Sequence, residues 1–143
     1  MATIELPEAL TTSPSFQIER VRRHTKDEVE RTLAKHDTTM REYWVLSCVD
    51  VAPMSQRQLS ELLIIDASDM VRLIDSLEKL GWVTRDRDPK DRRRQIVAAT
   101  KKGTKALAKL GDDVVAAEER ALEASSQKQL KNLKKLSQAL ETE

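Results

Sequence analysis

The hydrophobic residues of this chain recur at three- and four-residue steps over six stretches, the spacing that gathers side chains on one face of an α-helix. The stretches run from about 16 to 35, 39 to 51, 55 to 63, 66 to 80, 100 to 125 and 126 to 140. Two shorter segments, 82–85 and 95–100, are instead rich in β-branched residues, as strands are. The pattern therefore predicts a mainly α fold with a small β-hairpin.

The third and fourth predicted helices are short and adjacent in the sequence. Ser55 and Gln58 form a capping box that starts the third helix. Asp66 or Ser68 caps the fourth helix, and Gly81 supplies the left-handed residue that ends it. The apolar face of the third helix consists of Leu59, Leu62 and Leu63. That of the fourth consists of Met70, Leu73, Ile74, Leu77 and Leu80. Two short helices joined by a few residues are typical of a helix-turn-helix, whose second helix fits the major groove of DNA.

The polar face of the fourth helix carries the candidate base-reading residues Ser68, Asp69 and Arg72. Arg72 has the fork of donors that binds guanine O6 and N7 bidentately. Asp69 either accepts a hydrogen bond from cytosine N4 or serves as a first-turn charge on its own helix. Ser55 and Gln56, at the start of the supporting helix, are candidate contacts to the DNA backbone.

Positive charge is concentrated in and after the hairpin. Between residues 85 and 105 there are nine Lys or Arg and three Asp, a local excess of six positive charges in a chain whose net charge is +1. Such a concentration is typical of a surface that binds a polyanion. Because Asp residues alternate with the arginines, we expect some arginines to be held by carboxylates while others point outward. A hairpin of this kind beside a helix-turn-helix predicts a winged helix-turn-helix.

The hairpin tip also carries a family resemblance. The run Asp88-Pro89-Lys90-Asp91-Arg92-Arg93, after Leu77-Glu78-Lys79-Leu80-Gly81-Trp82-Val83, resembles the wing signature of the MarR family of bacterial transcriptional regulators. The run Thr100-Lys101-Lys102-Gly103 is similar to the family's strand-to-helix exit. The resemblance covers residues 39–110 by motif and the whole chain by length and helix order. It implies a homodimer on a pseudo-palindromic operator, with the recognition helix in the major groove and a wing arginine in the minor groove.

By motif position, the resemblance makes Arg93 the wing arginine and Asp91 the carboxylate that orients the wing. Arg92 and Arg94 are near neighbours that could share this contact, and we include Arg87 in the wing site. The family also implies a small aromatic or lipophilic effector that binds between the dimer core and the DNA-binding lobe. Tyr43 and Trp44 lie on a helix that would line this crevice, or else belong to the core.

The outer helices have narrow apolar seams that one chain of this size cannot cover. We therefore expect residues 16–37 and 101–143 of a single domain, 1–143, to form a helical dimerisation region, in agreement with the resemblance. Residues 39–100 would form the winged helix-turn-helix lobe.

Residues 1–15 are expected to be an arm ordered only against a partner. Gly111 is expected to mark a bend or a close approach of two helices. Two recognition helices on a twofold axis would reach major grooves about 34–36 Å apart.

The composition and the missing motifs argue against several other classes of function. Aromatic residues make up only 3% of the chain, which argues against a single-strand binder that depends on base stacking. The sequence shows no metal-ligand spacing, catalytic triad pattern or glycine-rich phosphate loop, so we expect neither an enzyme nor a cofactor. It has no apolar run of about 18 residues, and its first residues lack the features of a secretion signal. We expect a cytoplasmic protein without a membrane contact.

Two alternatives stay open from the sequence. One is a winged-helix adaptor that binds proteins without reading DNA sequence. The other is a MarR-type thiol redox sensor using Cys48, the single cysteine. Such a sensor needs a thiol whose pKa is lowered by nearby cations or a helix N-terminus. Cys48 lies in mid-helix with Asp50 nearby, where a small buried apolar residue is the simpler interpretation.

Overall fold

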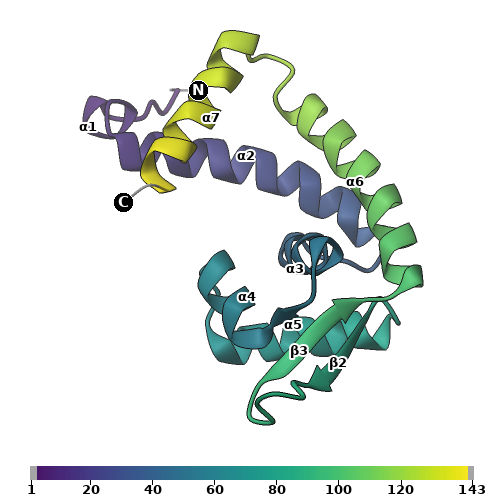
Figure 1. Cartoon of the computed structure of the whole chain (residues 1–143). Helices are drawn as coiled ribbons and strands as arrows, with labels where there is room; N and C mark the ends of the chain where they lie inside the picture. Colours follow the sequence, from purple (N-terminus) through teal and green to yellow (C-terminus); the bar gives the residue numbers. More distant parts are fainter. Residues whose placement is uncertain (1–2, 142–143) are drawn as a thin grey trace.

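The computed structural model describes residues 3–141 and contains seven helices and three strands within them. The helices are α1 (Glu8–Thr11), α2 (Pro14–Ala34), α3 (Met40–Val51), α4 (Gln56–Leu63), α5 (Ala67–Lys79), α6 (Lys101–Ala121) and α7 (Gln127–Glu141). The strands are β1 (Met54–Ser55), β2 (Val83–Arg87) and β3 (Gln95–Ala99). The long helices α2 and α6 pack together at one end, and the lobe formed by α3, α4, α5 and the sheet lies against that end (Figure 1). The hairpin of β2 and β3 projects from the lobe on the side away from α7 (Figure 1).

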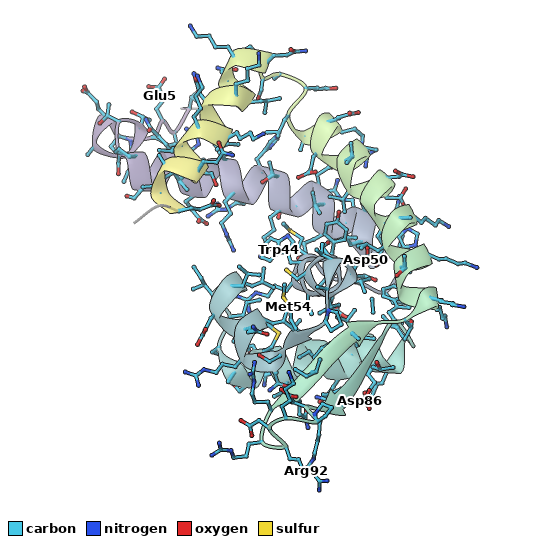
Figure 2. All side chains as sticks on the ribbon, in the orientation of Figure 1. Glu5, Trp44, Asp50, Met54, Asp86 and Arg92 are labelled. Atoms are coloured by element: carbon cyan, nitrogen blue, oxygen red, sulfur yellow. The ribbon has the colours of Figure 1, made fainter. Side chains whose placement is uncertain are left out.

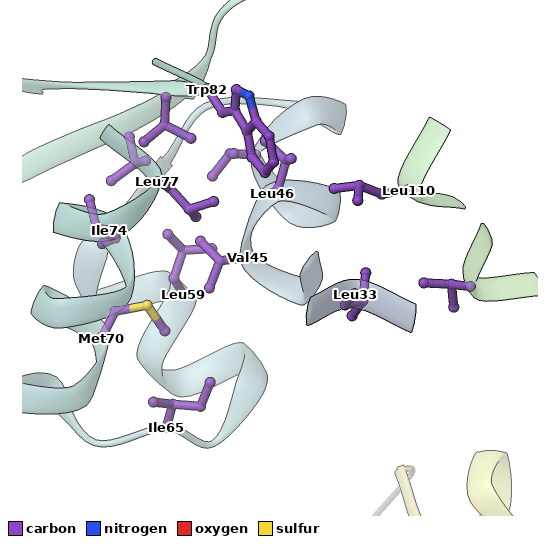
Figure 3. Packing of buried hydrophobic residues seen from close by; sticks show 14 of the residues in the cluster. Leu33, Val45, Leu46, Leu59, Ile65, Met70, Ile74, Leu77, Trp82 and Leu110 are labelled. Atoms are coloured by element: carbon purple, nitrogen blue, oxygen red, sulfur yellow. The ribbon is translucent and has the colours of Figure 1, made fainter. Parts of the chain in front are cut away.

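The hydrophobic core lies inside the lobe and extends to the two long helices. Its centre consists of Val45 and Leu46 of α3, Leu59 of α4, and Met70, Ile74 and Leu77 of α5, all completely buried. Leu33 of α2 and Leu110 of α6 reach the same cluster, as Figure 3 shows. The lobe is therefore fixed to the long helices by packing, and a change in their position would be transmitted to it.

The sheet contains one more strand than the sequence predicted. Its order is β1-β3-β2, all antiparallel, with Met54 opposite Val97 and Arg85 also opposite Val97 on the other side. The predicted hairpin of β2 and β3 is confirmed, but β1 was missed because it has only two residues, too few to show an alternating pattern. Pairing with β1 places the start of α4 beside the base of the wing.

Most predicted helix starts are confirmed. Side-chain caps are present at Thr39, Ser55, Asp66, Thr100 and Ser126. Ser55 and Gln58 form the predicted reciprocal capping box. Asp66, and not Ser68, caps α5, because Asp66 Oδ1 accepts the N–H of Asp69 at 2.8 Å. Gly81 has the predicted left-handed conformation, with φ of 77°.

Three expectations need correction. Residues 8–11 of the N-terminal arm form the short helix α1, whose carbonyl at Thr11 accepts a hydrogen bond from Gln17, so this part is ordered within one chain. Leu62 is 60% exposed, because α4 buries only the side that faces α3 and α5. Gly111 marks neither a bend nor a tight contact of two helices: α6 continues without a break, and a Cβ atom at this position would meet only the Tyr43 hydroxyl, at 3.6 Å.

The start of α6 is tightly attached to the segment between the recognition helix and the wing. Thr100 donates its N–H to the carbonyl of Trp82 at 2.9 Å and its hydroxyl to the carbonyl of Gly81 at 2.7 Å. A Cβ atom at Gly103 would lie 2.1 Å from the Trp82 carbonyl oxygen. Only glycine allows this close approach, so Gly103 sets the distance between α6 and the DNA-binding lobe.

Replacing Gly103 by Ala should lower the free energy of unfolding by about 1–3 kcal/mol. The new Cβ would clash with the backbone of Trp82, which cannot shift without moving the elements on either side of it. Gly111→Ala is the matched control on the same helix. Its Cβ would meet only Tyr43 Oη at 3.6 Å, an ordinary contact. That variant should gain up to about 1 kcal/mol from helix propensity. Urea denaturation at equal protomer concentration measures both, and a Gly103→Ala protein as stable as the parent would contradict the packing described.

Candidate nucleic-acid interface

The recognition helix α5 is buried on one face and polar on the other. Met70, Ile74 and Leu77 have no exposed surface, whereas Ser68 and Arg72 are exposed and Asp69 is half-buried. Ser68 donates its hydroxyl to Asp66 Oδ1 at 2.8 Å, within the capped first turn. The structure thus places the three predicted base-reading residues together at the start of α5, on the side away from the core.

Asp69 is ion-paired on both of its oxygen atoms. One carboxylate oxygen accepts a hydrogen bond from Arg72, and the other lies 3.5 Å from Arg41 Nη1 of α3. A carboxylate held by two guanidinium groups is less available to accept from a base, and it orients Arg72 instead. Arg41 was not predicted as a site residue, because it lies far from Asp69 in the chain and no motif links them.

A second polar contact joins α3 to the middle of α5. Glu42 is buried, and its carboxylate accepts a hydrogen bond from the Ser76 hydroxyl at 2.8 Å. A buried carboxylate is costly without such a partner, so this pair favours one arrangement of the two helices. Glu42 was not among the predicted core residues, since a charged side chain gives no apolar signal.

Arg85 of β2 connects the wing to the recognition helix. It donates a hydrogen bond to Asp75 and lies 3.5 Å from Glu78, both on α5. The hydrogen bond to Asp75 raises the pKa of Arg85, and the charges of Asp75 and Glu78 act in the same direction. Its side chain is largely covered. Arg85 was counted among the basic residues of the wing, but its charge is used inside the protein.

The wing tip carries arginines that are free to meet another molecule. Asp91 Oδ1 accepts hydrogen bonds from both the backbone N–H and the Nε–H of Arg93, at 3.1 and 3.2 Å. The Arg93 side chain is nevertheless 92% exposed. Arg87, Arg92 and Arg94 are exposed and have no ion-pair partner within residues 3–141. Figure 2 shows Arg92 at the end of the wing farthest from the long helices. The expected division between held and outward arginines is present.

A groove of about 1210 Å³ lies between the start of α4, the outward face of α5 and the wing, where it reaches from Arg85 of β2 to Asp91 and Arg93 at the tip. Its lining includes the arginines Arg57, Arg85, Arg93 and Arg94. Carboxylates are also present, and Arg57 pairs with Glu61 at 3.1 Å. A groove with guanidinium groups on several sides suits a phosphodiester strand. Arg57 was not predicted as a site residue, although its place in the first turn of α4 was visible in the sequence.

The two expected backbone contacts have different positions in this groove. Gln56 lines it and is half-buried. Ser55 also borders the groove but is 1% exposed, and its hydroxyl accepts the N–H of Gln58 at 3.0 Å. A direct contact from the Ser55 hydroxyl is therefore not available in this structure. Ser55 instead caps the N-terminus of α4, whose first residues Gln56 and Arg57 line the groove.

Other kinds of site find no support in the described part of the chain. No group of three or more His, Cys, Asp or Glu within residues 3–141 could hold a metal ion. None of the helices described is long and apolar enough to cross a membrane.

Comparison with known proteins agrees with this geometry. A family model described as the MarR family matches residues 36–94. The uncharacterized HTH-type transcriptional regulator YcgE of Bacillus subtilis (strain 168) is 36% identical over 61 residues, which cover 41% of this chain and 40% of that protein. Across the curated relatives that match, the aligned segment covers 37%, 40% and 57% of the relative's own length. Their names describe transcriptional regulators, in agreement with the expectation that this chain is not an enzyme.

Solved structures extend the similarity to nearly the whole chain. A MarR-family transcriptional regulator from Rhodococcus sp. RHA1 has a TM-score of 0.86 and 28% identity, covering 94% of this chain and 96% of its own. CouR from Rhodococcus jostii RHA1, solved with p-coumaroyl-CoA bound, has a TM-score of 0.80 and 29% identity, covering 94% and 95%. With the winged helix and its arginine-lined groove in place, these similarities show that the chain belongs to the MarR family of transcriptional regulators.

Proposed function

We propose that the protein is a sequence-specific regulator that binds duplex DNA as a homodimer on an inverted-repeat operator in the cytoplasm. The observation that carries this proposal is the shared groove. Val71 and Asp75 of α5 border it on one side, and Arg93 and Arg94 of the wing border it on another. A recognition helix and a wing on one face can enter the major groove and the adjacent minor groove together. We further propose that it acts as a repressor.

The recognition helix would supply the major-groove contacts. Arg72 is exposed and oriented by Asp69, which suits bidentate binding to guanine. Ser68 is exposed beside it in the first turn. We assign Asp69 the task of positioning Arg72, because both of its oxygen atoms are already paired with arginine. Gln56 and the N-terminus of α4 would contact the DNA backbone.

The wing would supply the minor-groove contact through Arg93. Asp91 holds the backbone and the Nε–H of this residue, while the rest of the guanidinium stays exposed. An arginine fixed at one end can enter a narrow groove with little further loss of side-chain entropy. Arg87, Arg92 and Arg94 would add contacts to phosphates, since they have no partner of their own in the described chain.

The outer helices support the proposed dimer. No residue of α7, all of which the structure describes, is buried. Large apolar side chains stay exposed on α2 and α7, namely Ile18, Val21, Leu130, Leu133, Leu136 and Leu140. Apolar surface of this extent on a helical seam is typical of an interface. A second copy is the partner proposed, because twofold symmetry would present two recognition helices to successive major grooves.

A small effector that controls DNA binding is part of the proposal. CouR, which shares the fold over most of its length, was solved with p-coumaroyl-CoA. Trp44 of α3 lies on the side of the lobe toward α2 in Figure 2, and this aromatic residue is 41% exposed. Tyr43, by contrast, packs against the core. An aromatic or lipophilic molecule beside Trp44 would act through its different affinity for two spacings of the recognition helices.

The alternative of a protein-binding adaptor is less well supported. A ribbon that served only as structure would not need exposed arginines without ion-pair partners. Arg87, Arg92 and Arg94 all lie on the wing. The cluster of positive charge and the groove beside it favour a polyanionic partner.

The redox alternative conflicts with the environment of Cys48. This thiol is half-buried in the middle of α3, and burial raises its pKa. A raised pKa lowers the fraction of thiolate at neutral pH, and the thiolate is the form that reacts with oxidants. Cys48 therefore has the properties of a packing residue.

We expect Cys48 to react with iodoacetamide more slowly in the native protein than in urea at pH 8, because the raised pKa leaves little thiolate. Mass spectrometry after timed quenching measures this difference. Peroxide at levels that oxidise an ordinary thiol should leave DNA binding unchanged in both the parent protein and Cys48→Ala. Loss of binding in the parent protein alone would establish the redox sensor instead.

The wing assignment predicts the effect of Arg93→Ala on binding to a random-sequence duplex. Affinity should fall at least about tenfold at low salt, since hydrogen bonds to charged groups contribute about 1.5–3 kcal/mol each. The slope of log K against log salt should become shallower by about 2 for a dimer that loses two charge contacts. Fluorescence anisotropy at several salt concentrations measures both quantities.

Lys109→Ala provides the control for this measurement. It removes the same charge from an exposed position on α6, outside the groove. Both quantities should stay close to those of the parent protein, because screening limits the reach of a distant charge. Equal effects of the two substitutions would show that only net charge matters and that the wing is not a specific contact.

A further inference from the structure

The outward face of α5 carries one apolar residue that the contacts above leave unused, Val71. It is 37% exposed, whereas Met70, Ile74 and Leu77 of the same helix are fully buried. The remaining large hydrophobic residues of α5 and its C-cap, Leu73 and Leu80, pack against the core. Val71 is therefore the one large hydrophobic residue of α5, a helix described in full, that lies outside the core cluster. Core packing does not account for it.

Its position places Val71 among the proposed DNA contacts. It follows Ser68 by three residues and precedes Asp75 by four, so the three side chains form one stripe along the helix. Val71 also lines the groove together with Arg57 and Arg94. An apolar side chain thus stands on the surface that would face the base edges.

The chemistry of that position is selective. Valine is β-branched and stabilises a helix less than alanine does. Its exposed methyl groups also make no favourable interaction with water, so neither helix stability nor solvation explains a valine at this position. Among the base edges in the major groove, the one apolar group is the C5-methyl of thymine. Contact between this methyl and the two valine methyls would remove apolar surface of both from water.

We propose that Val71 is a specificity-determining residue that contacts the C5-methyl group of a thymine in each half of the operator. This inference rests on the proposed function, since it requires α5 to enter the major groove. It adds a base preference that Ser68 and Arg72 do not supply, because those two residues would recognise hydrogen-bonding groups.

The test compares thymine with deoxyuridine, which lacks only the methyl group. Each thymine of an operator selected from random duplex DNA is replaced in turn by deoxyuridine, symmetrically in both half-sites. Binding of the parent protein, Val71→Ala and Val71→Thr is then measured at one salt concentration. Val115→Ala is the matched control, because Val115 is a 53% exposed valine on α6 outside the groove.

At one position per half-site, deoxyuridine should weaken binding of the parent protein about fourfold, or about fifteenfold for both half-sites together. Val71→Ala should bind the thymine and deoxyuridine duplexes equally, which is the coupling expected of two groups in contact. Val71→Thr, which keeps one methyl, should show a smaller preference for thymine than the parent protein. Val115→Ala should discriminate as the parent protein does. Thermal melting should show all variants folded, since Val71 and Val115 are exposed and lie outside the core.

Two results separate the failure of this inference from the failure of the proposed function. If the parent protein binds its selected operator tightly but no deoxyuridine substitution weakens it, Val71 does not contact a thymine methyl and only this inference is overturned. The same holds if Val71→Ala keeps the full preference for thymine. If neither the parent protein nor Val115→Ala enriches any sequence, both the proposed function and this inference are wrong.

Discussion

The attachment of α5 to the rest of the lobe is the constraint on which the binding surface depends. Three fully buried residues, Met70, Ile74 and Leu77, hold one face of the helix in the core. Polar contacts then fix it from two sides, through Ser76 to Glu42 of α3 and through Asp75 to Arg85 of the wing. With the helix held in this way, its outward face has one orientation relative to the wing. The groove between them is thus preformed, which lowers the cost of ordering on binding.

The same arrangement explains how a chain with a net charge of only +1 can present a strongly basic surface. Some arginines pair with carboxylates of the protein: Arg85 joins two elements, and the pair of Arg72 with Asp69 orients a side chain that stays exposed. Others on the wing have no partner in the described chain and keep their full charge for another molecule. Local placement of charge, more than the total, therefore determines what the surface attracts. The long helices contribute differently, through apolar seams that a second copy would cover.

The sequence predicted the parts of this structure that depend on local signals. Helix starts followed from cap residues such as Ser55 and Asp66, and the wing followed from its β-branched strands and charged tip. Contacts between distant segments were not predictable: the strand β1 is two residues long, and the pairing of Arg41 with Asp69 spans 28 positions without a motif. Burial was the other missing information. It showed that the hydroxyl of Ser55, the predicted cap, is not exposed, and that Val71 is an exposed apolar residue on a polar face.

Selection of bound sequences from random duplex DNA tests the central claim most directly, because the protein itself chooses the operator from all possible sequences. A dimer with two fixed recognition helices should enrich an inverted repeat whose half-site centres lie about 10–10.5 base pairs apart. Enrichment of such a repeat would establish a sequence-specific dimeric regulator and give the operator itself. Recovery of no preferred sequence, or of a single unrepeated site, would contradict the account of α5 as a paired reader of the major groove.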